Sequence, residues 1–156
     1  MTLFLVRHAN AGSRSDWDGA DVDRPLSGKG RRQVEAITAH LADAPVKRVL
    51  SSAAVRCQQT VAPVARARGL EVEVHPALTE GATAAQTTTL LWELAAEGED
   101  VVLSSHGDVI PAAIEALRGD GVEVGDRDGL PKGTLYAIAV SDEGTITTAT
   151  FVDPRP

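Results

Sequence analysis

The sequence has little cysteine. Cys57 is the single cysteine among 156 residues, so no disulfide can form within this chain. Secreted domains commonly depend on disulfides, whereas a lone thiol suits the reducing cytosol, and we therefore expect a cytoplasmic protein. The apolar run that begins the sequence is short and follows no basic stretch, so we expect no signal peptide.

Positive charge is also scarce. The chain carries 15 Lys and Arg against 22 Asp and Glu, a formal net charge of -7. Proteins that bind nucleic acid are normally basic, so we expect neither nucleic acid nor an anionic membrane surface as a partner. No apolar run approaches the length of about 20 residues that a membrane span requires. An anionic substrate would therefore need a local cluster of Arg and His side chains.

Aromatic residues are sparse as well, at 3% of the chain. The core must therefore be built from Val, Leu, Ile and Ala. The length of 156 residues is that of one ordinary domain, so we expect residues 1–156 to form a single domain.

Short apolar runs alternate with runs whose apolar residues recur at helical spacing. The apolar runs predict strands over 2–6, 48–50, 70–74 and 101–104, and a terminal hairpin over 134–140 and 145–152. The helical spacing predicts helices over 29–42, 53–68, 84–97 and 108–117, with Pro63 bending or breaking the second. Residues 9–28 and 119–132 are polar and rich in glycine, which is typical of loops.

Strands that alternate with helices are typical of an α/β fold. We expect a three-layer α/β/α sandwich whose central sheet is mostly parallel and covered on both faces. The terminal hairpin should add an antiparallel edge strand.

Reactive side chains follow the carboxyl ends of four predicted strands, where ligands bind in sheets of this kind. They are Arg7 and His8 after the first strand, Arg56 after the second, Glu80 after the third, and His106 with Gly107 after the fourth. Two Arg beside two His form an anion site, because guanidinium groups match phosphate oxygens in pairs. A neutral imidazole is a nucleophile toward phosphorus, and a carboxylic acid can protonate the leaving oxygen. The pattern favours His8 as the nucleophile, Arg7, Arg56 and His106 as a phosphoryl clamp, and Glu80 as the proton donor, with no metal or other cofactor.

Four ordered motifs resemble the histidine phosphatase superfamily, the phosphoglycerate mutase-like proteins. They are LFLVRHA over 3–9, LSGKGRRQ over 26–33, SSAAVRCQQT over 51–60, and SHG over 105–107. Within that family the chain is similar to the short phosphohistidine phosphatases of the SixA type, which also carry a segment like DVDRPL at 21–26. It is equally similar to the histidine phosphatase domain fused to Nudix hydrolases in some actinobacteria.

The resemblance implies a phosphohydrolase that forms a phosphohistidine on His8. Its substrate would be a phosphorylated small molecule, a nucleotide or a phosphohistidine protein. The chain lacks room for the insertions that enclose sugar phosphates in the mutases, so hydrolysis is favoured over mutase-type phosphoryl transfer. A non-catalytic phosphate-binding module is the other alternative.

Departures from the family pattern leave several roles open. Ala9 stands where Gly is common, and the region of Ser15 stands where the mutases place a phosphate-binding Asn. Candidate substrate-binding residues are Asn10, Ser15, Arg24 and Gly107, although Arg24 could instead pair with Asp21 or Asp23. The second large branch of the family places an Asp directly after the second His, but here Gly107 intervenes, so Asp108 is the second candidate for the proton donor.

Other reactive residues have simpler interpretations. The acidic residues of the 9–28 loop do not follow the spacing of a calcium-binding loop, so we expect them to be solvated. A metal hydrolase is disfavoured because His8 and His106 lack a helical His-x-x-x-His spacing and a clear set of carboxylate ligands. Cys57 should turn toward the core as a small hydrophobic residue.

Overall fold

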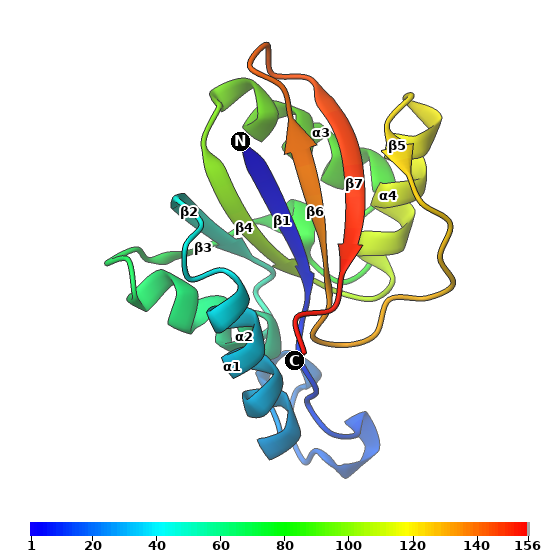
Figure 1. Cartoon of the computed structure of the whole chain (residues 1–156). Coiled ribbons are helices and arrows are strands. Elements are labelled where there is room, and N and C mark those ends of the chain that lie inside the picture. The colour runs from blue at the N-terminus through cyan, green and yellow to red at the C-terminus, as the bar shows by residue number, and fades with distance from the viewer. Residues whose placement is uncertain (156) are drawn as a thin grey trace.

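The computed structural model of the chain describes residues 1–155 (Figure 1). Its strands are β1 (Thr2–Arg7), β2 (Val46–Ser51), β3 (Val72–Val74), β4 (Asp100–Ser105), β5 (Glu123–Val124), β6 (Leu135–Val140) and β7 (Ile146–Val152). Its helices are α1 (Gly28–His40), α2 (Val55–Arg66), α3 (Ala84–Glu97) and α4 (Val109–Gly119), with short 3-10 turns η1 (Arg14–Asp16), η2 (Asp21–Asp23) and η3 (Pro76–Leu78). None of the helices within residues 1–155 combines the length and the apolar composition needed to cross a membrane.

The strands form one seven-stranded sheet in the order β3-β2-β4-β1-β6-β7-β5. Neighbouring strands from β3 to β1 run parallel, and β6 runs antiparallel to both β1 and β7. The sheet separates two helix layers, with α1 and α2 on one face and α3 and α4 on the other (Figure 1). The predicted α/β/α sandwich with a mostly parallel sheet is therefore confirmed.

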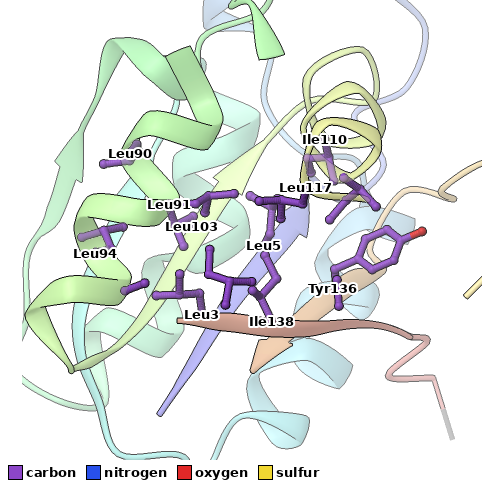
Figure 2. Close-up of a cluster of buried hydrophobic side chains, with 14 of the residues drawn as sticks. Leu3, Leu5, Leu90, Leu91, Leu94, Leu103, Ile110, Leu117, Tyr136 and Ile138 are labelled. Carbon is purple, nitrogen blue, oxygen red and sulfur yellow. The ribbon is translucent and has the colours of Figure 1, made fainter. Parts of the chain in front are cut away.

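The alternation of side chains along the central strands builds both layers. Leu3 and Leu5 of β1 pack toward α3 and α4, as Figure 2 shows, while Val6 packs with Ile37 of α1 and Val61 of α2 on the opposite face. Successive side chains of a strand point to opposite faces, so a continuous apolar run is what a strand covered on both faces requires. This core contains few aromatic side chains, as the composition predicts.

The antiparallel strand does not lie at the edge of the sheet, contrary to our expectation. β7 pairs with the outer side of β6, and β5 pairs in parallel with β7 through Glu123–Thr148 and Val124–Ala149. β5 lies within residues 119–132, which we expected to form only a loop. Two residues carry no periodicity, so this strand exists only because β7 offers an unpaired edge.

The predicted helices agree with the structure apart from their ends and Pro63. The helix α3 spans the predicted residues, and Thr83 and Gln86 form a capping box at its start. The expectation that Pro63 breaks α2 is wrong, because α2 continues through Pro63 to Arg66. Pro63 removes one backbone donor, the one that would bond to the carbonyl of residue 59, and α2 tolerates this single loss.

The parallel strands bring their carboxyl ends to one rim. Arg7 of β1 pairs with Ser105 of β4, and Ser51 of β2 pairs with Ser104. The segments that follow β1 and β2 stay beside β4. The His8 amide donates to Ser105 O and the Ser52 amide donates to Ser104 O, both at 3.0 Å. The residues that follow these three strands therefore lie side by side.

Candidate active site

A pocket of about 300 Å³ lies at this rim. It gathers every residue for which we predicted a catalytic role, together with Arg24 and Gly107, and the whole lining comprises Arg7, His8, Gly12, Arg14, Arg24, Arg56, Glu80, His106, Gly107, Asp108 and Lys132. Seven of these side chains are basic or imidazole groups, so the pocket concentrates positive charge in a chain whose net charge is -7. Such a concentration suits a small anion.

His8 is held in one tautomer. Its Nδ1 atom lies 2.8 Å from the carbonyl oxygen of Ala9, which can only accept, so Nδ1 carries the proton and Nε2 carries the lone pair. Burial lowers the pKa of His8 to about 3, and the neighbouring guanidinium groups act in the same direction. The imidazole is therefore neutral at physiological pH.

A threonine anchors the peptide that holds His8. The fully buried Thr60 accepts a hydrogen bond from the Ala9 amide at 3.0 Å and donates to the Arg56 carbonyl at 2.7 Å. Thr60 thus ties the segment after β1 to α2, one turn beyond Arg56. The sequence analysis did not assign Thr60 a role, although it closes the SSAAVRCQQT motif.

Arg7 and Arg56 present buried N–H groups that have no partner. Arg7 donates from NH1 to Leu130 O at 2.6 Å, and Arg56 donates from NH1 to Asp21 O at 2.9 Å. The Nε atoms of both residues are buried without a hydrogen-bond partner among the described residues. An unmade hydrogen bond from a buried polar group costs about 1–3 kcal/mol and more for a charged group, so both sites favour an incoming anion.

Gly107 makes room for Arg7. A Cβ atom at this position would lie 2.6 Å from Cζ of Arg7 and 2.7 Å from its NH2 atom. No side chain larger than hydrogen fits without displacing the guanidinium. Gly107 therefore shapes the pocket through the space that it leaves.

His106 faces His8 across the pocket, with the two ring centroids 5.5 Å apart and the rings near perpendicular. Its Nε2 atom lies 2.8 Å from Ser52 Oγ and 3.5 Å from Cys57 Sγ. Burial and the Arg56 guanidinium both lower the pKa of His106. Cys57 is buried, as we expected, and its thiol packs against His106. Burial raises the pKa of that thiol to about 12.

The carboxylates of the pocket are arranged around its arginines. Glu80 is 44% exposed and pairs with Arg14 at 3.0 Å and Arg56 at 3.2 Å. Asp108, the second candidate for the proton donor, accepts from the Gly81 amide at 2.9 Å. Both candidates therefore lie at the mouth of the same pocket.

Asp21 is not the solvated loop residue that we expected. It pairs with Arg14, Arg24 and Arg56 at 3.1, 3.2 and 3.2 Å respectively. Its slight burial acts to raise the pKa of Asp21, but the neighbouring guanidinium groups outweigh this effect and lower the pKa overall. A polar loop gives no periodic signal, so only the folded loop reveals this contact.

Arg24 and Lys132 complete the basic lining. The buried Arg24 pairs with Asp21, one of the alternatives left open, and also donates to Ala11 O at 2.6 Å. Lys132 comes from the 119–132 segment and was not among the predicted site residues. Burial, reinforced by the nearby arginines, lowers the pKa of Lys132.

Two predicted substrate-binding residues, Asn10 and Ser15, lie outside the pocket lining. Asn10 Oδ1 accepts from the Gly12 amide at 3.0 Å and from Ser27 Oγ at 2.7 Å, which fastens the loop to the start of α1. The exposed Ser15 of η1 shares a hydrogen bond with Ser13, the residue that caps this turn. Neither side chain lines the pocket around His8. Within the part of the chain that the structure describes, no three His, Cys, Asp or Glu side chains lie close enough together to hold a metal ion.

Comparison with known proteins is consistent across sequence and structure. The model of the histidine phosphatase superfamily (branch 1) matches residues 3–89. An 8-oxo-(d)GTP phosphatase of Mycolicibacterium smegmatis is 33% identical over 156 residues, which cover 98% of this chain and 48% of that protein. The chain thus spans about half the length of this curated relative.

Solved structures share the fold over nearly the whole chain. The protein histidine phosphatase SixA, complexed with tungstate, superimposes with a TM-score of 0.75 at 22% identity, covering 99% of this chain and 97% of its own. A protein from Agrobacterium tumefaciens, assigned as a SixA-type phosphohistidine phosphatase, gives a TM-score of 0.70 at 26% identity and covers 97% and 95% of the two chains.

Proposed function

Because this chain belongs to the histidine phosphatase superfamily, we propose that it is a phosphohydrolase that forms a phosphohistidine on His8 without a metal ion. The observation that carries the proposal is the state of His8. It is neutral, its proton is held on Nδ1 by Ala9 O, and two buried guanidinium groups with unpartnered Nε atoms line the same pocket.

The phosphoryl group binds first. Its oxygens accept hydrogen bonds from Arg7 and Arg56, whose unpartnered Nε atoms supply donors, and His106 lies opposite. Transfer spreads charge over the equatorial oxygens, so cations fixed in place before the reaction stabilise the transition state.

His8 then attacks. The Nε2 lone pair forms the N–P bond while the bond from phosphorus to the leaving oxygen breaks, and that oxygen takes a proton from Glu80. In the second step Glu80, now a carboxylate, accepts a proton from water as the water oxygen attacks phosphorus. The P–N bond breaks, its electron pair returns to Nε2, and inorganic phosphate leaves.

Glu80 suits both steps because its environment changes with the bound phosphoryl group. In the free pocket, Arg14 and Arg56 pair with the carboxylate. An anion bound to Arg56 competes with the carboxylate for that guanidinium, so it weakens the pairing and frees the carboxyl group of Glu80 to face the leaving oxygen. Asp108 is the alternative donor, because it lines the same pocket.

Hydrolysis is favoured over mutase chemistry by the openness of the pocket. Glu80 and Arg14 at its mouth have side chains 44% and 63% exposed, so water reaches the phosphohistidine. A mutase must keep water away from that intermediate.

The substrate class comprises phosphorylated small molecules, nucleotides and phosphohistidine proteins. The relative named as an 8-oxo-(d)GTP phosphatase supports a nucleotide among them.

The test is to trap the intermediate. Wild-type protein is mixed with a panel of nucleoside monophosphates, sugar phosphates and a phosphohistidine peptide, denatured in alkali, and analysed by mass spectrometry. We expect acid-labile phosphate on His8 and release of inorganic phosphate, both lost in His8→Ala. Turnover by His8→Ala at the wild-type rate would overturn the proposal, and phosphate binding without turnover on any substrate would indicate a regulatory module instead.

A further inference from the structure

A second hollow adjoins the active-site pocket. It measures about 240 Å³ and is lined by residues of the 9–28 loop, among them Trp17, Pro25 and Asp16. Gly12 and Arg24 line both this hollow and the pocket around His8. We call it the Trp17 hollow. A substrate whose phosphoryl group binds at Arg7 and Arg56 can therefore extend past Gly12 and Arg24 into it.

The indole of Trp17 is held in place yet exposed. Its Nε1 atom donates to Ala20 O at 2.9 Å, and a Cβ built on Gly19 would lie 3.1 Å from the same atom, so the ring rests against the Gly19 backbone. The residue is nevertheless 37% exposed. The ring therefore offers a fixed aromatic face beside the pocket on which a flat ring can stack.

The wall between the two hollows is rigid. Arg24 is buried and donates from NH1 to Ala11 O at 2.6 Å and to Gly12 O at 3.3 Å, while its Nε pairs with Asp21. The distance between the phosphoryl site and the Trp17 ring is therefore set by the loop itself.

We propose that the Trp17 hollow is a subsite for the base of a nucleoside monophosphate, an inference that rests on the phosphohydrolase function proposed above. A flat heterocycle stacks on an indole, as bases do on the aromatic side chains of nucleic-acid-binding proteins. The loop also carries Asp16, Asp18 and Asp23, so it repels a leaving group with further phosphates and accepts an uncharged base. Asp16, which lines the hollow, is an acceptor for a base edge with N–H donors.

The test compares a substrate that has a base with one that has none. We expect wild-type protein to hydrolyse GMP with a higher kcat/KM than ribose 5-phosphate. Trp17→Ala should lower the ratio of these two kcat/KM values about tenfold, within the range that base stacking supports, and Trp17→Phe should restore most of it. The matched control is Val22→Ala, since Val22 is an exposed hydrophobic residue of the same loop that lies outside both hollows, and it should leave the ratio unchanged.

Binding can be read without turnover. The chain has two tryptophans, so Trp92→Phe leaves Trp17 as the only indole. We expect GMP, and not ribose 5-phosphate, to quench its fluorescence. An unchanged kcat/KM ratio in Trp17→Ala together with no quenching by GMP would overturn the subsite. If ribose 5-phosphate still phosphorylates His8 in that case, the proposed function stands and only the subsite is rejected. If no substrate phosphorylates His8, the proposed function fails, and the quenching by GMP then decides the subsite by itself.

Discussion

The Nδ1 atom of His8 donates a hydrogen bond of 2.8 Å to the carbonyl oxygen of Ala9, the residue directly after it. This contact fixes the tautomer of the imidazole and leaves the lone pair on Nε2. Because the contact uses only the backbone carbonyl of Ala9, its side chain does not alter it, and Ala can stand where the family commonly has Gly.

The first prediction concerns Thr60, which positions the Ala9 peptide. Thr60→Val keeps the shape of the side chain but removes the acceptor for the Ala9 amide and the donor to Arg56 O. A buried donor left unpaired costs about 1–3 kcal/mol, and the His8 ring loses its support. We expect kcat to fall about tenfold at little change in KM, with lower stability in urea.

Thr60→Ser is the control, because it retains the hydroxyl that makes both contacts. It should recover most of the wild-type kcat even if it packs less tightly. Equal kcat values for the Val and Ser variants would show that the hydroxyl has no positioning role.

The second prediction concerns the pH dependence of stability. The pKa of His8 is about 3 in the folded protein against a reference value of 6.5, so the unfolded chain binds more protons between these values. His8 therefore favours the folded state fully above about pH 6.5 and progressively less as the pH falls toward 3. The slope reaches at most about 1.4 kcal/mol for each pH unit.

Urea unfolding at several pH values between 4 and 7 measures this slope. His8→Gln should flatten the curve in this window, whereas the exposed His40→Gln should not. Parallel curves for wild type and His8→Gln would contradict the depressed pKa. For the same reason the acid limb of kcat/KM should show no ionisation near 6.5 that belongs to His8.

The third prediction concerns the space over Arg7. In Gly107→Ala the new Cβ would lie 2.6 Å from Cζ of Arg7, so the guanidinium must move away from the phosphoryl site. A displacement of about 1 Å can reduce a rate a hundredfold, and we expect kcat/KM to fall between tenfold and a hundredfold. Stability should change less than activity, because a side-chain tip rather than backbone is displaced.

Gly119→Ala serves as the comparison, since a Cβ at the end of α4 meets nothing within 4 Å. Its kinetics should match the wild type. If Gly107→Ala retained the wild-type kcat/KM, the observed position of the Arg7 guanidinium would not be required for activity.

The fourth prediction separates Glu80 from Asp108 as the proton donor. Glu80→Gln should lower kcat about a hundredfold to ten-thousandfold for an alkyl phosphate, whose leaving oxygen needs a proton. The loss should be much smaller for p-nitrophenyl phosphate, whose leaving group departs as an anion. If Asp108→Asn shows this dependence on the leaving group and Glu80→Gln does not, then Asp108 is the donor.

Much of the fold could be predicted because its signals are local. The apolar runs of β1 and β4 are continuous because both faces of these strands are covered, and α3 begins at the Thr83 cap and ends at Gly98, which adopts a positive φ of 80°. Deviations came from contacts that are remote in sequence. β5 depends on the edge of β7, and β6 became an interior strand because β7 paired outside it.

The sequence by itself determined which residues could meet at the rim. Arg7, His8, Arg56 and His106 directly follow strands or begin the next helix, and parallel strands carry such residues to the same edge. Only the tertiary structure decided how the loops complete the site. Lys132 lines the pocket, and Asp21 pairs with the pocket residue Arg56. Asn10 holds its own loop in place, and Trp17 remains exposed in the adjoining hollow. Loops lack a repeating pattern, so the contacts of their side chains depend on the surface against which the loop folds.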